Sequence, residues 1–227
     1  MSAEQRRFYD ARRRFYYETL KRRIAEDGLN ASRFFILEAL LELRKIATIP
    51  EEKSEGAIIS AKRELLIESV QDAVLNGHKV LVFTNFLAAV ELLSTDLAER
   101  GIGHLTMTGA THNRESLVRQ FQTRDDLKVF ILTLKTGGLG LNLTAADTVF
   151  VFDPWWNIAA ESQAVDRAHR IGQDRTVFTY KLITRDSVEE KIRQLQERKQ
   201  HLFDAVISSD GLALKSLTEA DVDDILG

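Results

Sequence analysis

The sequence predicts an α/β fold in which a parallel β-sheet carries helices on both faces. Stretches such as "KVLVFT" are continuously apolar, and segments with helical periodicity lie between them. Strands without polar alternation belong to sheets that are buried on both faces, and helical crossovers make such sheets parallel. The strands are expected at 79–84, 128–133, 148–153 and 176–183, with a further short run at 104–109.

The helices between these strands follow from their 3.6-residue periodicity and from the glycines that end several of them. They are expected at 60–77, 85–101, 113–123 and 157–172. A glycine-rich turn, "TGGLGLN", follows the strand at 128–133.

The residues on either side of the α/β segment are expected to be helical. One helix runs to Gly28, a suitable C-cap, and a second begins at Ala31 and stops before Pro50. A long helix starts at Asp186, with Ser187 and Glu190 as a capping box. Its apolar side carries Val188, Ile192, Leu195 and Leu202, and a short acidic helix at 218–226 closes the chain.

Composition narrows the classes of function. The 227 residues include no cysteine, which excludes disulfides and thiolate metal sites and favours a reducing, intracellular compartment. No apolar run approaches the ~20 residues of a membrane span. The net charge of -3 gives no global signal for a polyanionic partner, so any binding to nucleic acid would depend on local patches.

The segment "ESQAVDRAHRIGQDR" places Gln163, Arg167 and Arg170 on one face of a helix. Ala160, Ala164, Ala168 and Ile171 form a separate apolar edge. A guanidinium is always charged and matches phosphate oxygens, so this face could receive a terminal phosphate. It could also be an ordinary charged surface, because cations suit the end of a helix and Glu161 and Asp166 are near enough to pair locally. Spacing alone leaves both interpretations open.

Within that segment, "QAVDRAHRIGQ" resembles motif VI of superfamily 2 helicase-like ATPases in its Swi/Snf-type form, Gln-x-x-x-Arg-x-His-Arg-x-Gly-Gln. Other segments are similar to the same family in the expected order. "KVLVFTNF" resembles motif IV, "GATHNRESLVRQF" the stretch called IVa, and "LKTGGLGLNLTAADTVFVFDPWWN" motif V and the segment after it. "LLELRKIATIP" resembles the helix that precedes this lobe. The resemblance covers nearly the whole chain and implies a C-terminal RecA-like lobe of a DNA translocase.

The resemblance also implies roles for residues at matching positions. Arg167 and Arg170 would be arginine fingers for ATP, with Gln163 beside them. Gly138 and Gly140 would let the backbone approach the nucleotide. The residues implied to contact DNA or to link DNA contact to the nucleotide are Arg114, Thr133, Lys135, Trp156 and Asn157.

Two positions in these motifs depart from the family. Ile158 stands where the family usually has proline, and Leu134 where it usually has a small polar residue. "KIATIP" also lacks the usual Cys-His before the proline. Neither Ile158 nor Leu134 removes a charged group, and the missing Cys-His is expected to affect packing alone.

The phosphate cradle of an ATPase is missing from the sequence. No G-x-x-x-x-G-K-[ST] occurs, and Asp153 at a strand end is followed by proline rather than by a second acid. We therefore expect the chain to hydrolyse no ATP by itself and to bind no cofactor tightly. ATP and Mg²⁺ would be shared with the N-terminal RecA-like lobe of the same polypeptide, and no metal site is expected within this chain.

These expectations divide the chain into three parts. Residues 1–59 form an N-terminal helical extension and linker, 60–185 the RecA-like lobe, and 186–227 C-terminal helices that pack on the lobe. The expected partners are double-stranded DNA, the N-terminal lobe and a DNA-bound protein, with no membrane.

Three other functions are alternatives to that of a DNA translocase lobe. An RNA-directed superfamily 2 lobe is less consistent with the Gly-Gln ending of motif VI. A non-catalytic protein-interaction module stays open. A nicotinamide-binding site is disfavoured, because residues 141–147 are too few for the crossover helix that should follow its glycines.

Overall fold

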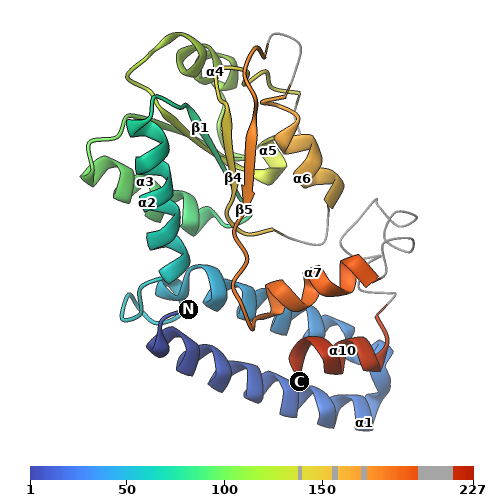
Figure 1. Cartoon of the computed structure of the whole chain (residues 1–227). Coiled ribbons are helices and arrows are strands. Elements are labelled where there is room, and N and C mark those ends of the chain that lie inside the picture. The colour runs from blue at the N-terminus through green and yellow to red at the C-terminus, as the bar shows by residue number, and fades with distance from the viewer. Residues whose placement is uncertain (138–139, 155–157, 170–172, 199–216) are drawn as a thin grey trace. The chain divides into compact units, whose positions relative to one another are not determined.

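The chain folds into two compact units in a computed structural model (Figure 1). The structure describes residues 1–137, 140–154, 158–169, 173–198 and 217–227. Residues 63–154 and 158–182 form one unit, which we call the lobe. Residues 1–62 and 183–227 form the other, which we call the helical unit.

The lobe is built on a five-stranded parallel sheet in the order β2-β3-β1-β4-β5. The strands are β1 (Val80–Thr84), β2 (His104–Met107), β3 (Val129–Thr133), β4 (Thr148–Val151) and β5 (Phe178–Lys181). Every residue of β1, β3 and β4 is buried, as their unbroken apolar runs predict. The predicted strands and their parallel arrangement are confirmed.

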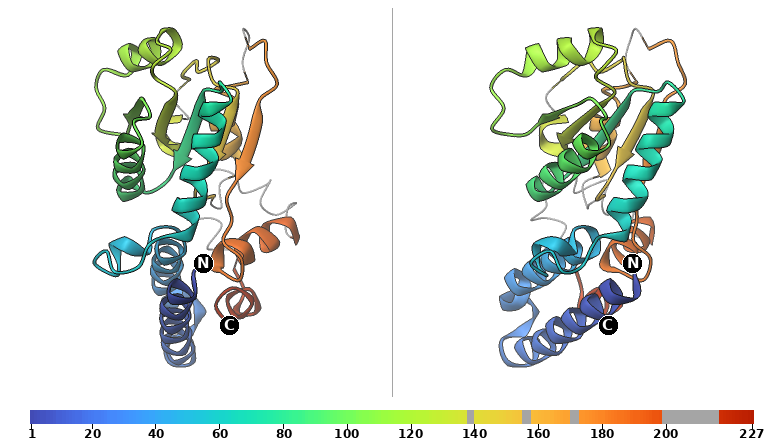
Figure 2. Two further views of the ribbon diagram at one scale, coloured as in Figure 1. Left: turned by 60° about the vertical axis from the view of Figure 1, so that its left-hand side comes forward. Right: turned by 90° about the vertical axis from the view of Figure 1, so that its left-hand side faces the viewer.

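Helices cover both faces of this sheet (Figures 1 and 2). They are α2 (Ala61–Leu75), α3 (Leu87–Glu99), α4 (Arg114–Thr123), α5 (Leu134–Gly137) and α6 (Ile158–Val165). Phe121 of α4, Leu134 of α5 and Ala164 of α6 pack in one cluster with Leu81 and Phe83 of β1. Figures 1 and 2 place α2 and α3 on the opposite face. The fold class predicted from the sequence is therefore confirmed.

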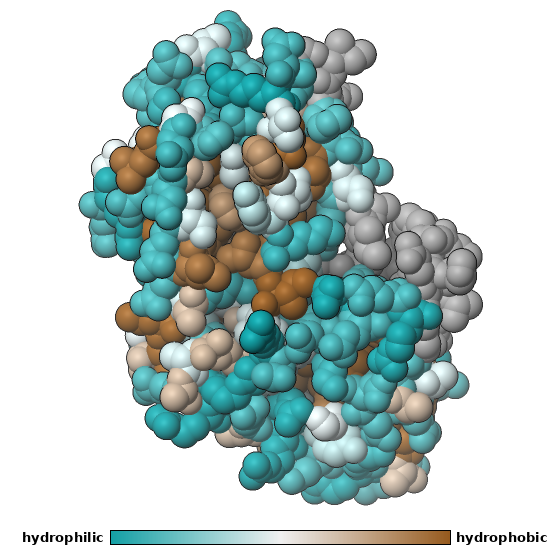
Figure 3. All heavy atoms as spheres, in the orientation of Figure 1, coloured by the Kyte–Doolittle hydropathy of each residue, from teal (hydrophilic) through white to brown (hydrophobic). Residues whose placement is uncertain are grey.

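Strand β5, at one edge of the sheet, is exposed to solvent along its length among the residues that the structure describes. The four residues of β5 are exposed, and Phe178 and Tyr180 are each half exposed on the same side of the strand. Figure 3 shows apolar side chains on the face of the lobe beside α2, where β5 lies.

The helical unit is formed by α1 (Ala3–Thr48), a short 3₁₀ turn η1 (Pro50–Glu52), α7 (Val188–Arg198) and α10 (Glu219–Leu226). Gly28 interrupts α1 with φ 81° and ψ 166°, so the predicted break between two helices is confirmed. Leu20, Leu40 and Leu43 of α1 pack with Ile192 and Leu195 of α7 in one core.

Two expectations about helices need correction. The α-helix expected at 157–172 ends at Val165, because residues 166–168 tighten into turns. The apolar sides of α7 and α10 contact α1, and the packing of residues 186–227 on the lobe stays a prediction. Ser187 does cap α7 by accepting from the Glu189 amide at 3.2 Å, whereas Glu190 accepts from Asp186 rather than from Ser187.

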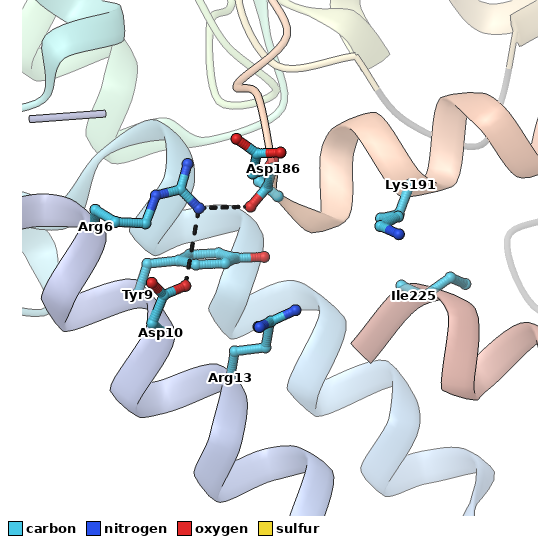
Figure 4. Close-up of a pocket in the computed structure, with 8 residues that line it drawn as sticks. Arg6, Tyr9, Asp10, Arg13, Asp186, Lys191 and Ile225 are labelled. Carbon is cyan, nitrogen blue, oxygen red and sulfur yellow. Dashed lines mark hydrogen bonds and ion pairs between the residues drawn. The ribbon is translucent and has the colours of Figure 1, made fainter. Parts of the chain in front are cut away.

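A surface pocket of the helical unit is held by side chains that bind backbone groups (Figure 4). The Arg6 guanidinium donates to the carbonyls of Arg185 at 2.7 Å and Asp186 at 2.6 Å. The Tyr9 hydroxyl accepts from the Val188 amide at 2.8 Å, and burial raises the pKa of Tyr9, which keeps this hydroxyl neutral. These contacts fix the start of α7 on α1.

A buried ion pair joins Lys62 and Glu189 of the helical unit. The Lys62 ammonium is 2.6 Å from one Glu189 oxygen and 2.7 Å from the other, and Glu189 has no exposed side-chain surface. Glu189 also accepts from the Thr48 hydroxyl at 2.9 Å and the Thr184 amide at 2.8 Å. One carboxylate therefore joins the end of α1, the beginning of α2 and the beginning of α7.

Within the described residues, no helix is both long enough and apolar enough to cross a membrane.

We expect Lys62→Met to lower the free energy of unfolding by about 3 kcal/mol or more, because the Glu189 charge would stay buried without its cation. Urea denaturation measures this loss. The double variant K62M/E189Q should lose less, because a neutral amide needs no counter-ion. The matched control Arg193→Met breaks an exposed i,i+4 pair with Glu197 and should cost less than about 1 kcal/mol. Equal losses for K62M and R193M would contradict the role given to the buried pair.

Candidate functional site

Arg167 lies in the turn that follows α6. Its amide donates to the Ala164 carbonyl at 3.2 Å, and the Ala168 amide donates to Val165 at 3.0 Å. Both bonds join residues three apart, which is the tighter spacing of a 3₁₀ turn. Ala164 and Ala168 are fully buried, so the turn packs closely through small side chains.

The Arg167 guanidinium is not neutralised by the acids near it in sequence. Its side chain is half buried, and its Nε is buried without a hydrogen-bond partner. Among the described residues, none forms an ion pair with Arg167. Glu161 pairs instead with Lys181 at 2.8 Å, and Asp166 is exposed. A buried donor without an acceptor costs about 1–3 kcal/mol, so the neighbouring described residues do not satisfy the Arg167 side chain.

The residues predicted to accompany Arg167 are only partly described. Gln163 lies one turn earlier on α6 and is exposed. Arg170 and Gly138 fall outside the described residues. Gly140 has φ +76°, and a Cβ there would meet no atom within 4 Å. Glycine is therefore required by the backbone conformation, and its open side leaves room for a ligand.

The loop from Gly140 to Asp147 is bound to the Arg167 turn by the backbone and by glutamine side chains. The Leu143 amide donates to the Arg167 carbonyl at 3.0 Å. The Gln173 amide nitrogen donates to the carbonyls of Ala146 at 2.8 Å, Thr144 at 3.1 Å and Ala168 at 3.1 Å.

Gln122 of α4 holds the same loop from the other side. It accepts from the Ala145 amide and donates to the Asn142 carbonyl, each at 2.9 Å. Neither Gln122 nor Gln173 is among the site residues predicted from the sequence. Only the fixed position of Gln173 in motif VI could have signalled its importance.

The residues predicted to contact DNA differ in accessibility. Lys135 is exposed on α5. Thr133 is only 8% exposed, and its hydroxyl lies 3.0 Å from the Thr136 hydroxyl. Trp156 and Asn157 fall outside the described residues. Of the two predicted residues at the end of β3, the geometry favours Lys135 as a surface contact.

Arg114 begins α4 and holds the loop that follows β2. Its Nε donates to the Thr111 carbonyl at 2.9 Å and its Nη2 to the Gly109 carbonyl at 3.0 Å. Its remaining N–H groups have no partner among the described residues. Arg114 can therefore both shape this loop and offer donors to an anion.

Parallel pairing separates these two groups of residues. Thr133 and Lys135 follow the carboxyl end of β3, whereas the contacts of Arg167 and Gln173 are to residues just before β4. Strands β3 and β4 both run parallel to β1. The first group therefore lies toward the carboxyl ends of the strands and the second toward their amino ends.

Asp147 organises the edge of the sheet near Gln173. It is 3% exposed, lies 3.0 Å from the His78 ring and accepts from Arg175 at 3.0 Å. Burial alone would raise the pKa of the Asp147 carboxyl, but hydrogen bonds from His78 and Arg175 outweigh it and lower the pKa. The cluster joins the segments that lead into β1, β4 and β5.

Asp153 has a structural role at the other end of β4. Its carboxylate oxygens accept from the Asn85 amide at 2.9 and 3.1 Å, and the side chain is fully buried. Within the described residues, no group of three or more histidines and acids could hold a metal.

The chain is similar to known helicase-like proteins. Residues 61–172 match the model for the helicase conserved C-terminal domain. An uncharacterized ATP-dependent helicase of Mycoplasma genitalium is 33% identical over 225 residues, which are 98% of this chain and 21% of the relative. The chromatin-remodeling ATPase INO80 of Emericella nidulans is 41% identical over 151 residues, which are 66% of this chain and 9% of the relative.

The structural comparison agrees. The SWI2/SNF2 ATPase core of Sulfolobus solfataricus, solved in complex with double-stranded DNA, has a TM-score of 0.82 and 30% sequence identity. The match covers 99% of this chain and 48% of that one. The chain spans about a fifth of the length of the first curated relatives it matches.

We expect Asp147→Asn to destabilise the lobe at pH 7 and to weaken the dependence of its stability on acid. The folded-state pKa of Asp147 is lowered, so its carboxylate stabilises the fold at a pH above the unfolded-state pKa of about 3.9. That contribution is lost as the pH falls through the lower folded-state value. Urea denaturation at pH 7, 5 and 3 should therefore show the wild type and D147N converging. The exposed control Asp72→Asn should follow the wild type, and a constant gap between wild type and D147N would contradict this assignment.

Proposed function

Since the chain is a C-terminal RecA-like lobe of the Swi/Snf type within the superfamily 2 helicase-like ATPases, we propose that it supplies Arg167 and Arg170 to ATP held by an N-terminal lobe. The two lobes together would form an ATP-dependent translocase on double-stranded DNA. This chain would contribute the arginine fingers and part of the grip on DNA phosphates.

The half-buried Arg167 side chain, which forms no ion pair among the described residues, carries this proposal. A guanidinium offers planar paired donors to phosphate oxygens, and charge on a transferring phosphoryl group is stabilised by such donors. The packing of Ala164 and Ala168 fixes the backbone on both sides of Arg167. Gln163, exposed one turn away on α6, would lie beside the same phosphate. Gly140, where a Cβ would meet no atom within 4 Å, would face the nucleotide.

The DNA grip is proposed for Lys135 and Arg114, which have donors available at the surface. Thr133 would help to position Lys135, two residues later, rather than contact DNA itself, because its hydroxyl is buried against Thr136. Trp156 and Asn157 keep their proposed role in linking DNA contact to the nucleotide. Support for DNA as the partner comes from the Sulfolobus core, which was solved with double-stranded DNA.

The proposed cycle has few chemical steps for this chain to perform. Closure of the two lobes would bring Arg167 against the terminal phosphate, where it would offset the negative charge that develops during hydrolysis. Mg²⁺, when bound by the other lobe, would neutralise charge on the phosphates. Reopening would shift the phosphate grip of one lobe relative to the other. Without a phosphate cradle of its own, the chain alone would not hydrolyse ATP.

The material moved by the enzyme would be DNA carrying a bound protein. The support is the similarity of this chain to INO80 of Emericella nidulans, which is named as a chromatin-remodeling ATPase.

We expect Arg167→Ala to reduce DNA-stimulated ATP hydrolysis in the two-lobe enzyme by about 10³-fold or more while leaving DNA affinity unchanged. Phosphate release with and without duplex DNA measures the first effect, and fluorescence anisotropy of labelled duplex the second. The matched control is Arg119→Ala, which removes an exposed guanidinium of α4. Stimulation by RNA but not by duplex DNA would favour the RNA-directed alternative, and no loss in R167A would overturn the finger assignment.

We expect Lys135→Ala to weaken duplex binding equally for all sequences and to reduce the slope of log K against log salt by about one. A titration series at increasing salt measures that slope. Lys21→Ala changes the same charge on the helical unit, in a side chain paired with Asp223, and is the control. An unchanged slope in K135A would remove Lys135 from the grip.

A further inference from the structure

We propose that Gln173 is a positioning residue that fixes the Arg167 turn against the loop at 140–147, and so sets the geometry of the arginine that meets the phosphate. The consequence for ATP hydrolysis rests on the proposed function, but the structural coupling does not.

The side-chain amide of Gln173 donates to three backbone carbonyls that lie outside the helices and strands. Two belong to Thr144 and Ala146, in the loop before β4, and the third belongs to Ala168, next to Arg167. A primary amide has two N–H groups, so the three acceptors share them at 2.8–3.1 Å. One side chain therefore joins the two segments that motifs V and VI contribute to the lobe.

The same glutamine is itself held in place. Its Oε1 accepts from the Arg175 amide at 3.0 Å, and the Arg175 side chain binds the buried Asp147 carboxylate at 3.0 Å. Asp147 lies directly before β4, so the segment after motif VI is anchored to the sheet at two points. This anchoring limits how far Gln173 can move with respect to the loop it binds.

Arg167 is then constrained on two sides. The Leu143 amide donates to its carbonyl at 3.0 Å, and Gln173 binds the carbonyl of the next residue. A change in the loop at 140–147 would therefore move the Arg167 turn, and the reverse also holds. In a site where an error of about 1 Å costs up to 10²-fold in rate, such a link decides how well the guanidinium is placed.

Gln173→Glu is the most specific substitution, because it keeps the shape of the side chain and replaces its donors with a second oxygen. The carboxylate would face three carbonyl oxygens, so we expect Q173E to disturb the site more than Q173A. Gln71→Glu makes the same chemical change at an exposed position of α2 and serves as the matched control.

Hydrogen exchange on the chain alone tests the coupling without any nucleotide. We expect the Leu143 amide to exchange about tenfold faster or more in Q173A, and faster still in Q173E, because its bond to Arg167 is no longer supported. The Val82 amide in the centre of β1 should keep its rate. An unchanged Leu143 rate, or equal acceleration at Val82, would overturn the proposal, since the second result indicates general destabilisation.

ATP hydrolysis by the two-lobe enzyme tests the consequence. We expect kcat to fall about tenfold or more in Q173A while KM for ATP changes less than about threefold, because a misplaced finger acts mainly in the transition state. If R167A abolishes hydrolysis and Q173A resembles the wild type, the positioning role is wrong and the proposed function stands. If R167A retains hydrolysis, the proposed function fails, and the exchange experiment still decides the coupling.

Discussion

Parallel pairing of all five strands decides where functional side chains can lie in this lobe. Each connection must return from the carboxyl end of one strand to the amino end of the next. Helix α5, in motif V, and helix α6, in motif VI, lie on the same face of the sheet and contact each other. Lys135 follows the carboxyl end of β3, whereas the Arg167 turn contacts residues before β4. The order β2-β3-β1-β4-β5 keeps β3 and β4 on either side of β1, so one rigid sheet supports both groups.

Buried polar groups fasten the irregular ends of these elements. Backbone groups outside helices and strands need other partners, and buried charges are tolerated only where hydrogen bonds satisfy them. Asp153 receives the Asn85 amide after β1, and Asp147 receives His78 and Arg175 before β4. Lys79 donates to the carbonyls of Phe121 and Arg124 at the end of α4, and burial lowers its pKa. Glu189 has the same role in the helical unit, where it binds Lys62. Gln122 and Gln173 do the same with neutral side chains, because they bind backbone groups of the loop at 140–147.

Much of the architecture could be predicted from local pattern. The apolar runs of β1, β3 and β4 are nearly continuous, and a strand buried on both faces has few other ways to satisfy that pattern. The helix break at Gly28 follows from a backbone conformation with positive φ that glycine adopts without strain. The site residues stay predictions from the motifs, in which the guanidinium and glycine positions indicate chemistry on a phosphate. The alternative of local pairing for Arg167 could not be decided from spacing.

Sequence by itself determined three things: the succession of strands and helices along the chain, the class of the sheet, and Arg167 as a candidate phosphate contact. All three depend on residue type and on near neighbours in the sequence. Tertiary structure alone decided that α6 tightens after Val165, that Thr133 is buried while Lys135 is exposed, and that α7 packs on α1. It also decided that Gln173 binds three carbonyls from two separate segments. The physical reason is the same in each case: the partner of the side chain or helix lies far away in sequence, and only the folded chain brings the two together.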